Sequence, residues 1–161
     1  MGYDDGSDGM GYVEDLRALV GQRPVILVGA IVLLVDENER LLLQQRKHPA
    51  GRWSFPGGLM ELGESGEDTA RREVREETSL ELGELRLLNA YSGPEHFLTA
   101  PNGDQYYVVT LAYVGRDFRG VLKVNDDESM DMRFFALDDI PDGLVTTHRR
   151  ILADYVAQAG R

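Results

Sequence analysis

Residues 58 to 80 read GLMELGESGEDTARREVREETSL, and this stretch decides the fold of the chain. The residues before Ser65 include glycines and suit a turn-rich loop. Ser65, with Asp68 three positions later, has the spacing of a capping box at the start of a helix. The pattern therefore predicts a loop that leads into one helix, which runs to about Thr78.

Three glutamates, Glu73, Glu76 and Glu77, have a spacing that brings them to neighbouring positions on the surface of that helix. Successive residues are about 100° apart around a helix, so these glutamates border the narrow apolar stripe of Ala70 and Val74. Carboxylates turned toward the packed side repel one another and lose solvation unless a positive group joins them. A hard divalent cation is the natural partner, and Mg²⁺ is the first candidate, with Mn²⁺ as a substitute.

The same stretch contains a spaced pattern made of Gly58, Glu64, Arg72, Glu73, Val74, Glu76 and Glu77. An accidental match of this kind is expected at a given position on the order of once in ten million. At these residues the chain resembles the Nudix hydrolase family, of MutT-like type. Compatible flanking features at residues 53–58 and 133–138 extend the resemblance. It implies the α/β class, with a Nudix-type α/β/α sandwich and a mixed β-sheet.

One position departs from the family pattern, which has glycine where this chain has Ser79. Glycine is favoured there because a helix commonly ends in the left-handed conformation. A residue with a Cβ atom costs roughly 1 kcal/mol in that conformation. We expect the substitution to affect local stability and to leave the metal ligands unchanged.

The expected elements follow from the hydrophobic periodicity and the turn residues. Helices are expected at residues 12–20 and 147–157, besides the one that begins after Ser65. Strands are expected at residues 25–35, 41–46, 53–55, 84–91, 105–114, 121–124 and 132–136. Turns are expected at residues 36–39, 56–58 and 101–104.

The composition limits the classes of function. The 161 residues fit one domain, so we expect a disordered leader at residues 1–9 and a single Nudix hydrolase domain at residues 10–161. The absence of cysteine excludes disulfides and thiolate nucleophiles, and it suits the cytoplasm. A net charge of -11 disfavours nucleic acid as a partner, and no apolar run approaches the ~18 residues of a membrane span. A homodimer is compatible with these features.

The resemblance implies hydrolysis of a nucleotide or a related small diphosphate by water attack at phosphorus. It assigns the metal ligands to Gly58, Glu73, Glu76 and Glu77, with Gly58 acting through its carbonyl oxygen. Arg72 lies beside Glu76 on the expected helix, and we expect it to orient that carboxylate. Glu64 is expected to brace the helix or to reach the metal through water.

A general base is also needed, and its position stays open between two groups of acids. Glu76 or Glu77 can serve as the base. The alternative is the acidic loop of residues 126–128, from which we select Glu128. Related proteins have a glutamate a short distance before an Arg-Phe pair such as the one at residues 133–134.

Substrate contacts are expected from several residues outside the helix. Arg46 and Arg52 can hold a phosphate, and Gly57 lets the backbone approach the phosphates without a Cβ atom. Phe97 and Tyr107 can stack on a base, with Tyr91 and Tyr106 as alternatives, since only one of Tyr106 and Tyr107 can face the cleft. The three histidines are isolated in the sequence and receive no role.

The substrate is expected to be a nucleoside diphosphate linked to another group, because the markers that distinguish narrower subfamilies are not cleanly met. A nucleoside triphosphate pyrophosphohydrolase with a sanitation role is the first alternative. A non-catalytic nucleotide-sensing module of the same fold is the second, although the complete set of acids disfavours it. A diphosphate isomerase is disfavoured because the chain has no cysteine.

Overall fold

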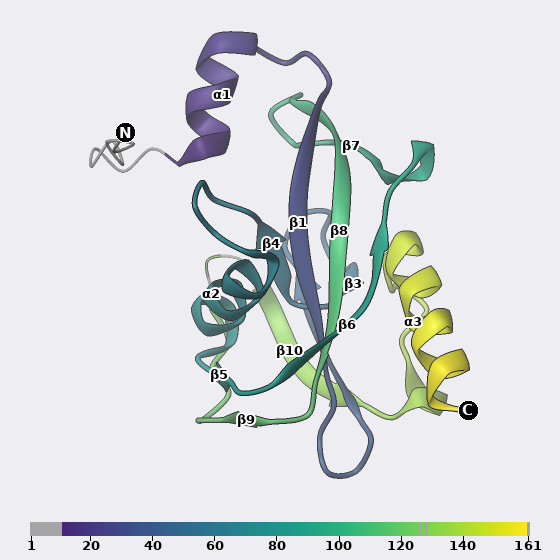
Figure 1. Cartoon of the computed structure of the whole chain (residues 1–161). Coiled ribbons are helices and arrows are strands. Elements are labelled where there is room, and N and C mark those ends of the chain that lie inside the picture. The colour runs from purple at the N-terminus through teal and green to yellow at the C-terminus, as the bar shows by residue number, and fades with distance from the viewer. Residues whose placement is uncertain (1–10, 126, 128, 161) are drawn as a thin grey trace.

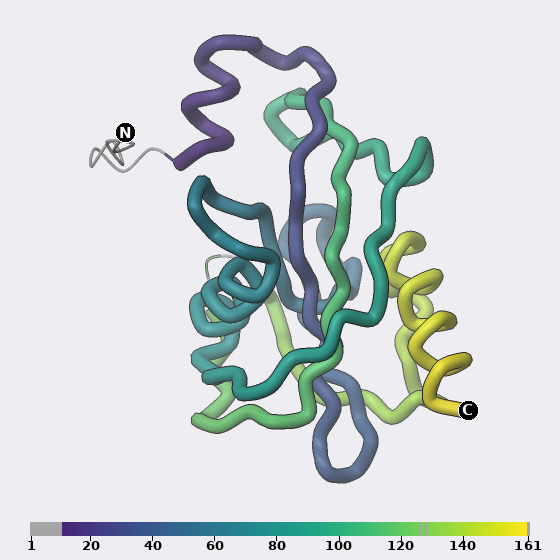
Figure 2. The backbone as a smooth tube through the Cα atoms, in the orientation of Figure 1, coloured from purple at the N-terminus to yellow at the C-terminus, as the bar shows by residue number. Residues whose placement is uncertain are grey.

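The computed structural model describes residues 11–125, 127 and 129–160. Two long strands, β1 (Val25–Leu34) and β8 (Gln105–Gly115), run parallel and side by side through the middle of the molecule (Figure 2). Strand β4 (Gly57–Leu59) pairs antiparallel with β1, while β6 (Leu85–Tyr91) and β7 (Phe97–Thr99) pair antiparallel with β8. The central sheet is therefore mixed, as the sequence predicts.

Two smaller sheets complete the strand arrangement. Strand β2 (Leu41–Arg46) lies between β10 (Ser129–Phe135) and β3 (Trp53–Ser54), and both pairings are antiparallel. Strand β5 (Glu81–Leu82) pairs with β9 (Phe118–Arg119). The short 3-10 helices η1 (Pro94–His96) and η2 (Leu137–Asp139) lie in the connections.

Helices cover both sides of the strands (Figure 1). Helix α2 (Gly66–Thr78) packs on one side and α3 (Thr146–Ala159) on the other. Helix α1 (Tyr12–Val20) has no buried residue and lies beyond the start of β1. None of the helices in the described part of the chain is long and apolar enough to cross a membrane.

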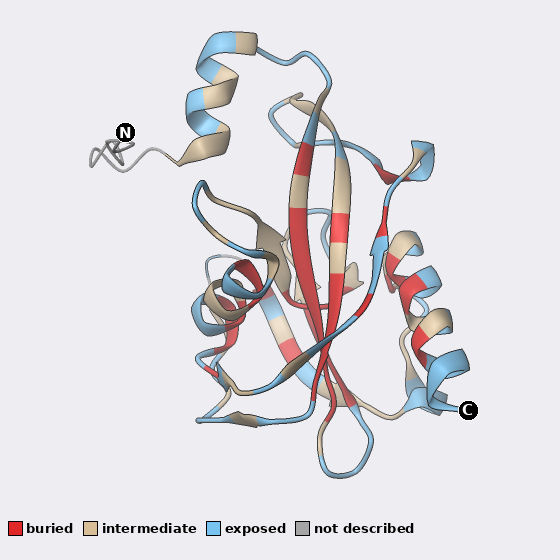
Figure 3. Ribbon diagram, in the orientation of Figure 1, coloured by how far each residue is buried: buried red, intermediate tan, exposed pale blue. Residues whose placement is uncertain are grey.

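Strand β1 is buried on both of its faces, and its alternation creates two cores (Figure 3). Ile31 and Leu33 belong to the core on the α3 side, whereas Val32 and Leu34 belong to the core on the α2 side. A β-branched and leucine-rich run without alternation is typical of a strand that is covered on both faces. This arrangement confirms the expected α/β/α sandwich.

Two local predictions were wrong. The strand expected at residues 121–124 is irregular, and β9 forms just before it, because Gly120 turns the chain with a φ of 109°. The turn expected at residues 56–58 is replaced in part by β4, which lies so close to β1 that a Cβ on Gly57 would be 2.1 Å from the Ala30 carbonyl oxygen. The other main elements agree with the prediction to within a few residues. The expected leader, residues 1–9, lies outside the described part.

The ends of α2 agree with the sequence pattern. The Ser65 hydroxyl accepts a hydrogen bond from the Asp68 N–H, and the Asp68 carboxylate accepts one from the Ser65 N–H, each at 3.0 Å. At the other end, the exposed Ser79 has φ 65° and ψ 10°, which is the left-handed conformation expected there. The serine therefore carries the conformational cost that glycine avoids.

We predict that Ser79→Gly raises the free energy of unfolding by about 1 kcal/mol, because it removes the Cβ atom from a left-handed position. Urea denaturation of the two proteins measures the difference. Ser79→Ala is the matched control, since alanine keeps the Cβ atom and gains nothing. Equal stability of the glycine and alanine variants would show that this conformation carries no measurable cost.

Candidate active site

Arg72 on α2 connects the helix to the loop before it and to β4. Its Nε and Nη2 atoms donate to the two oxygens of Glu64 at 2.7 and 2.9 Å, and Nη1 donates to Glu73 at 2.9 Å. Nη2 also donates to the Leu59 carbonyl oxygen at 3.0 Å. The hydrogen bonds from Arg72 lower the pKa of Glu64, and Glu64 in turn raises the pKa of Arg72. Both groups therefore stay charged.

The pairing expected between Arg72 and Glu76 is also present, since Nη1 donates to the Glu76 carboxylate, but it is not the main contact of Arg72. The two side chains are 3.4 Å apart, and the Glu76 side chain remains 55% exposed. Glu64 is the principal partner because the loop folds back over α2, which helical spacing alone does not reveal. Glu64 also accepts hydrogen bonds from the Glu61 N–H and the Thr69 hydroxyl, so its contacts suit a bracing role.

The two glycines of β4 let its backbone lie against the carboxylates of α2. A Cβ atom on Gly58 would be 2.3 Å from the Glu73 carboxyl carbon. The Gly57 N–H donates to the Glu77 carboxylate at 3.0 Å. A Cβ atom on Gly57 would collide with the backbone of β1, so glycine is required there, whereas at Gly58 the Glu73 side chain would have to shift.

Glu77 is buried, with 4% of its surface exposed. Besides the Gly57 N–H, the Gln44 amide donates to it at 3.5 Å. The Ser129 hydroxyl donates to the Gln44 carbonyl oxygen at 2.8 Å and fixes the orientation of that amide. Gln44 was not predicted from the sequence, although a polar residue near the end of an apolar strand is a usable signal.

The donor set suits a hard divalent cation, which prefers oxygen ligands. Glu73 lies beside Gly58 and Glu77 accepts the Gly57 N–H, so both carboxylates adjoin β4, and the Gly58 carbonyl oxygen has a second lone pair available. The Glu76 side chain is more exposed, and among the described residues its only side-chain hydrogen bond is the long one from Arg72. Within the described residues, no three acidic or histidine side chains are already gathered around one point. Glu73 is instead turned toward Arg72, so binding would require the carboxylates to reorient.

Two cavities meet beside Glu77. The first, the basic cavity, has a volume of about 330 Å³ and is lined by Gln44, Arg46, Lys47, His48, Gly57, Glu77 and Asp127. The second, the apolar cavity, has a volume of about 160 Å³, and its walls include Phe55, Leu98, Tyr106, Val108, Thr110, Thr147 and His148. Arg46 and Gly57 line both cavities and form their shared wall.

Arg46 is held in this wall by its Nε atom, which donates to the Ser54 hydroxyl at 2.9 Å. Burial lowers the pKa of the Arg46 guanidinium, and the nearby Glu77 carboxylate opposes that shift. An arginine cannot be deprotonated in the ordinary pH range, so Arg46 brings a fixed positive charge to the junction of the cavities. The structure thus brings Arg46 to the site, where it adjoins Lys47 and His48, which the sequence analysis missed.

His148 lies in the wall of the apolar cavity and is buried. The Phe55 N–H donates to its Nδ1 atom at 3.1 Å, and the two rings stack with centroids 5.6 Å apart. Burial, with a smaller contribution from Arg46, lowers the pKa of His148 to about 3. The imidazole is therefore neutral, and its proton is on Nε2, because Nδ1 acts as an acceptor. The sequence contained no signal for this role.

The other residues expected to contact the substrate or to act as the base do not all line the two cavities. The Arg52 guanidinium donates to the Leu144 carbonyl oxygen at 3.3 Å and lines neither cavity. Phe97 and Tyr107 contact each other on an exposed surface, with ring centroids 5.1 Å apart, while Tyr106 lines the apolar cavity. From the acidic loop, Asp127 reaches the basic cavity. Glu128 lies outside the described residues.

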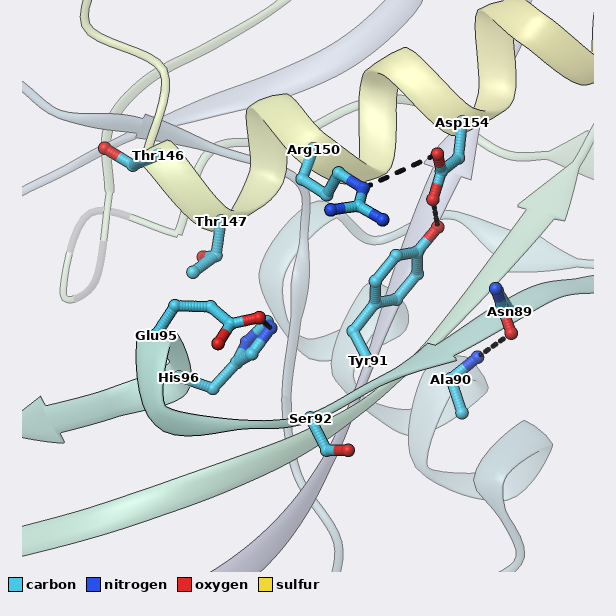
Figure 4. Close-up of a pocket in the computed structure, with 10 residues that line it drawn as sticks. All are labelled: Asn89, Ala90, Tyr91, Ser92, Glu95, His96, Thr146, Thr147, Arg150 and Asp154. Atoms are coloured by element: carbon cyan, nitrogen blue, oxygen red, sulfur yellow. Dashed lines mark hydrogen bonds and ion pairs between the residues drawn. The ribbon is translucent and has the colours of Figure 1, made fainter.

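A third cavity, the polar cavity, lies between the end of β6 and α3 and has a volume of about 410 Å³ (Figure 4). The Tyr91 hydroxyl donates to Asp154 at 2.8 Å, and Arg150 lies 3.7 Å from the same carboxylate. Thr147 lines both this cavity and the apolar cavity, so the two adjoin. Tyr91 is thus engaged in the polar cavity and does not line the apolar one.

Comparisons with known proteins identify the family of the chain. The model of the NUDIX domain matches residues 25–155. An ADP-ribose pyrophosphatase of Methanocaldococcus jannaschii is 32% identical over 134 residues, which are 83% of this chain and 73% of that protein. An NAD-capped RNA hydrolase NudC of Vibrio atlanticus is 29% identical over 74% of this chain, and the match spans 40% of that longer protein.

Solved structures give the same result. A MutT NUDIX hydrolase from Burkholderia pseudomallei is 31% identical, with a TM-score of 0.69 over 81% of this chain and 98% of that chain. The MutT protein from Methanosarcina mazei, at 19% identity, shares the fold with a TM-score of 0.70. The chain belongs to the NUDIX family. It is a pyrophosphohydrolase, and its family acts on nucleotide-derived substrates with a divalent metal ion.

We predict that Arg72→Lys lowers the free energy of unfolding by roughly 2 kcal/mol, because lysine cannot make the paired contact with Glu64 and also reach Glu73 and Leu59. Urea denaturation measures the change. Arg75→Lys is the matched control, since Arg75 is exposed on the same helix, and its effect should stay within about 0.5 kcal/mol. Equal effects of the two substitutions would contradict a structural role for the Arg72 contacts.

Proposed function

We propose that the enzyme hydrolyses the diphosphate bond of a nucleoside diphosphate linked to another group, by attack of water at phosphorus. The observation that carries this proposal is the shared wall of the basic and apolar cavities, formed by Arg46 and Gly57 beside Glu77. A diphosphate at this wall has cations on one side and an apolar surface for a base or sugar on the other. The name of the M. jannaschii relative, an ADP-ribose pyrophosphatase, supports the same class of substrate.

In this proposal, the residues that line the two cavities bind different parts of the substrate. Arg46 binds a phosphate oxygen, with Lys47 and His48 alongside it in the basic cavity. Gly57 leaves space for the diphosphate, while Tyr106 and Leu98 pack against the attached group. Arg52, Phe97 and Tyr107 are proposed only for outer parts of a larger substrate, since they lie away from the shared wall.

We assign the metal ligands to Glu73, Glu76, Glu77 and the Gly58 carbonyl oxygen, and the ion to Mg²⁺, with Mn²⁺ as a substitute. When bound, a divalent cation stabilises the charge that grows on the phosphates and acidifies the attacking water. The role of Arg72 is to hold Glu73 in place until the ion binds, and the role of Glu64 is to hold Arg72. The Gly57 N–H fixes one oxygen of Glu77.

The proposed general base is Glu128, and Glu76 and Glu77 are the alternatives. The position of Asp127 in the wall of the basic cavity supports a base from this acidic loop. Cytoplasmic location also stays a prediction, supported by the absence of cysteine.

We predict that Glu77→Gln and Glu128→Gln both lower kcat at least about a hundredfold, but for different reasons. Only Glu77→Gln should also weaken Mg²⁺ binding, because it removes a ligand charge. Steady-state kinetics at varied Mg²⁺ and calorimetric titration of the ion measure the two effects. The exposed Glu67 of the same helix supplies the control, and Glu67→Gln should change neither quantity by more than about twofold.

These measurements test the general base and the metal ligands separately. Near-normal turnover of Glu128→Gln would return the role of base to Glu76 or Glu77. Normal turnover and normal Mg²⁺ binding of Glu77→Gln would contradict the metal site itself.

Hydrolysis in oxygen-18-labelled water tests the proposed reaction. With a nucleoside diphosphate sugar and Mg²⁺, we predict label in a phosphate product and a nucleoside monophosphate among the products. Label in the sugar would mean cleavage at carbon. Binding of the same compounds without turnover would support the nucleotide-sensing alternative, and faster turnover of nucleoside triphosphates would favour the sanitation role.

A further inference from the structure

Among the described residues in the wall of the apolar cavity, no side chain offers the cavity an acceptor alone, because Arg46 and His148 are donors there and the hydroxyls can donate or accept. The side chains in its wall with polar atoms are those of Arg46, Tyr106, Thr110, Thr147 and His148. Among the described residues that line it, none has a carboxylate or carboxamide side chain. The adjoining polar cavity differs, since its wall contains Glu95 and Asp154, which are acceptors (Figure 4). The apolar cavity is thus the one suited to a ligand group that accepts hydrogen bonds.

For His148, the structure determines which ring nitrogen carries the proton. Its Nδ1 atom accepts the Phe55 N–H, so the proton is on Nε2. In the described part of the structure Nε2 makes no hydrogen bond, and this atom is not fully buried, although only 7% of the residue is exposed and the residue lines the cavity. A donor that stays accessible and lacks a partner within the protein is available to a ligand.

Nε2 cannot easily change from a hydrogen-bond donor to an acceptor. An acceptor at Nε2 would require the proton to move to Nδ1, where it would face the Phe55 N–H and break a buried hydrogen bond. Gaining a second proton would not help, since both nitrogens would then be donors. Arg46 on the neighbouring wall adds further donors. Arg46 and His148 therefore remain donors in each accessible protonation state, whereas the threonine and tyrosine hydroxyls of the wall can also accept.

We propose that His148 is a specificity-determining residue, whose Nε2–H donates to a carbonyl-type acceptor on the base bound in the apolar cavity. The preferred substrates are then nucleoside diphosphate derivatives with an oxo group on the base, as in hypoxanthine, over those with an amino group, as in adenine. This inference rests on the proposed function. An amino group at that position would set two donors against each other and leave both unpaired.

The test uses two substrates that differ in the base alone, inosine diphosphate ribose and adenosine diphosphate ribose. We expect the wild-type enzyme to favour the inosine compound at least ~10-fold in kcat/KM, mainly through KM. Binding of inosine and adenosine monophosphates, measured by calorimetry, gives the same preference without any need for hydrolysis.

Two substitutions separate recognition from folding. His148→Asn places an amide oxygen near the position of Nδ1, so it can still accept the Phe55 N–H, but it lacks the distal donor. His148→Gln brings an amide N–H near the position of Nε2. We expect the base preference to fall to within about twofold of unity in the asparagine variant and to be partly restored in the glutamine variant. Thermal unfolding checks that both variants fold.

The outcomes distinguish this inference from the proposed function. No preference in the wild type, a preference for adenine, or a preference that survives in His148→Asn would overturn the role of His148, even where hydrolysis is observed. A preference in monophosphate binding that depends on His148, without hydrolysis of any diphosphate, would support the role of His148 and reject the proposed reaction.

Discussion

The site depends on the contacts of one guanidinium group, that of Arg72. It neutralises Glu64, contacts Glu73, and donates to the Leu59 backbone, so the loop, β4 and α2 take one relative position. Such partly buried ion pairs add little net stability relative to well-packed apolar residues, because desolvation offsets much of their attraction, although removing one partner of an existing pair is costly. Their value here is geometric. They keep a carboxylate-rich helix against a sheet before any metal ion supplies the compensating charge.

The second requirement is space for the backbone. Gly57 and Gly58 place β4 where side chains would collide with Ala30 and Glu73. The same approach lets the Gly57 N–H reach the buried carboxylate of Glu77, which needs hydrogen bonds in exchange for lost water. The absence of side chains at two positions thus lets β4 serve both as the edge of the sheet and as the floor of the site.

Local signals in the sequence predicted most of the elements, including the capped start of α2 and the left-handed conformation of Ser79. They also predicted that Arg46 would lie near the site, because it ends a strand beside the glycine-rich turn. They could not predict contacts made by distant segments. The pairing of Arg72 with Glu64 depends on the path of a loop, and the position of His148 depends on how α3 packs beside Phe55. Similarly, the choice of Tyr106 over Tyr107 depends on the registers of β7 and β8.

The burial of β1 on both faces bears on how the chain can be lengthened or fused. Inserting one residue within β1 would exchange the side chains of the two cores and displace Gly57 from its position opposite Ile31. The exposed turn of residues 37–40 lies after the end of the same strand, away from both cavities. An insertion there costs little more than the entropy of a longer loop. A reporter or an affinity tag therefore belongs in this turn, where the pairing of β1 with β8 is left intact.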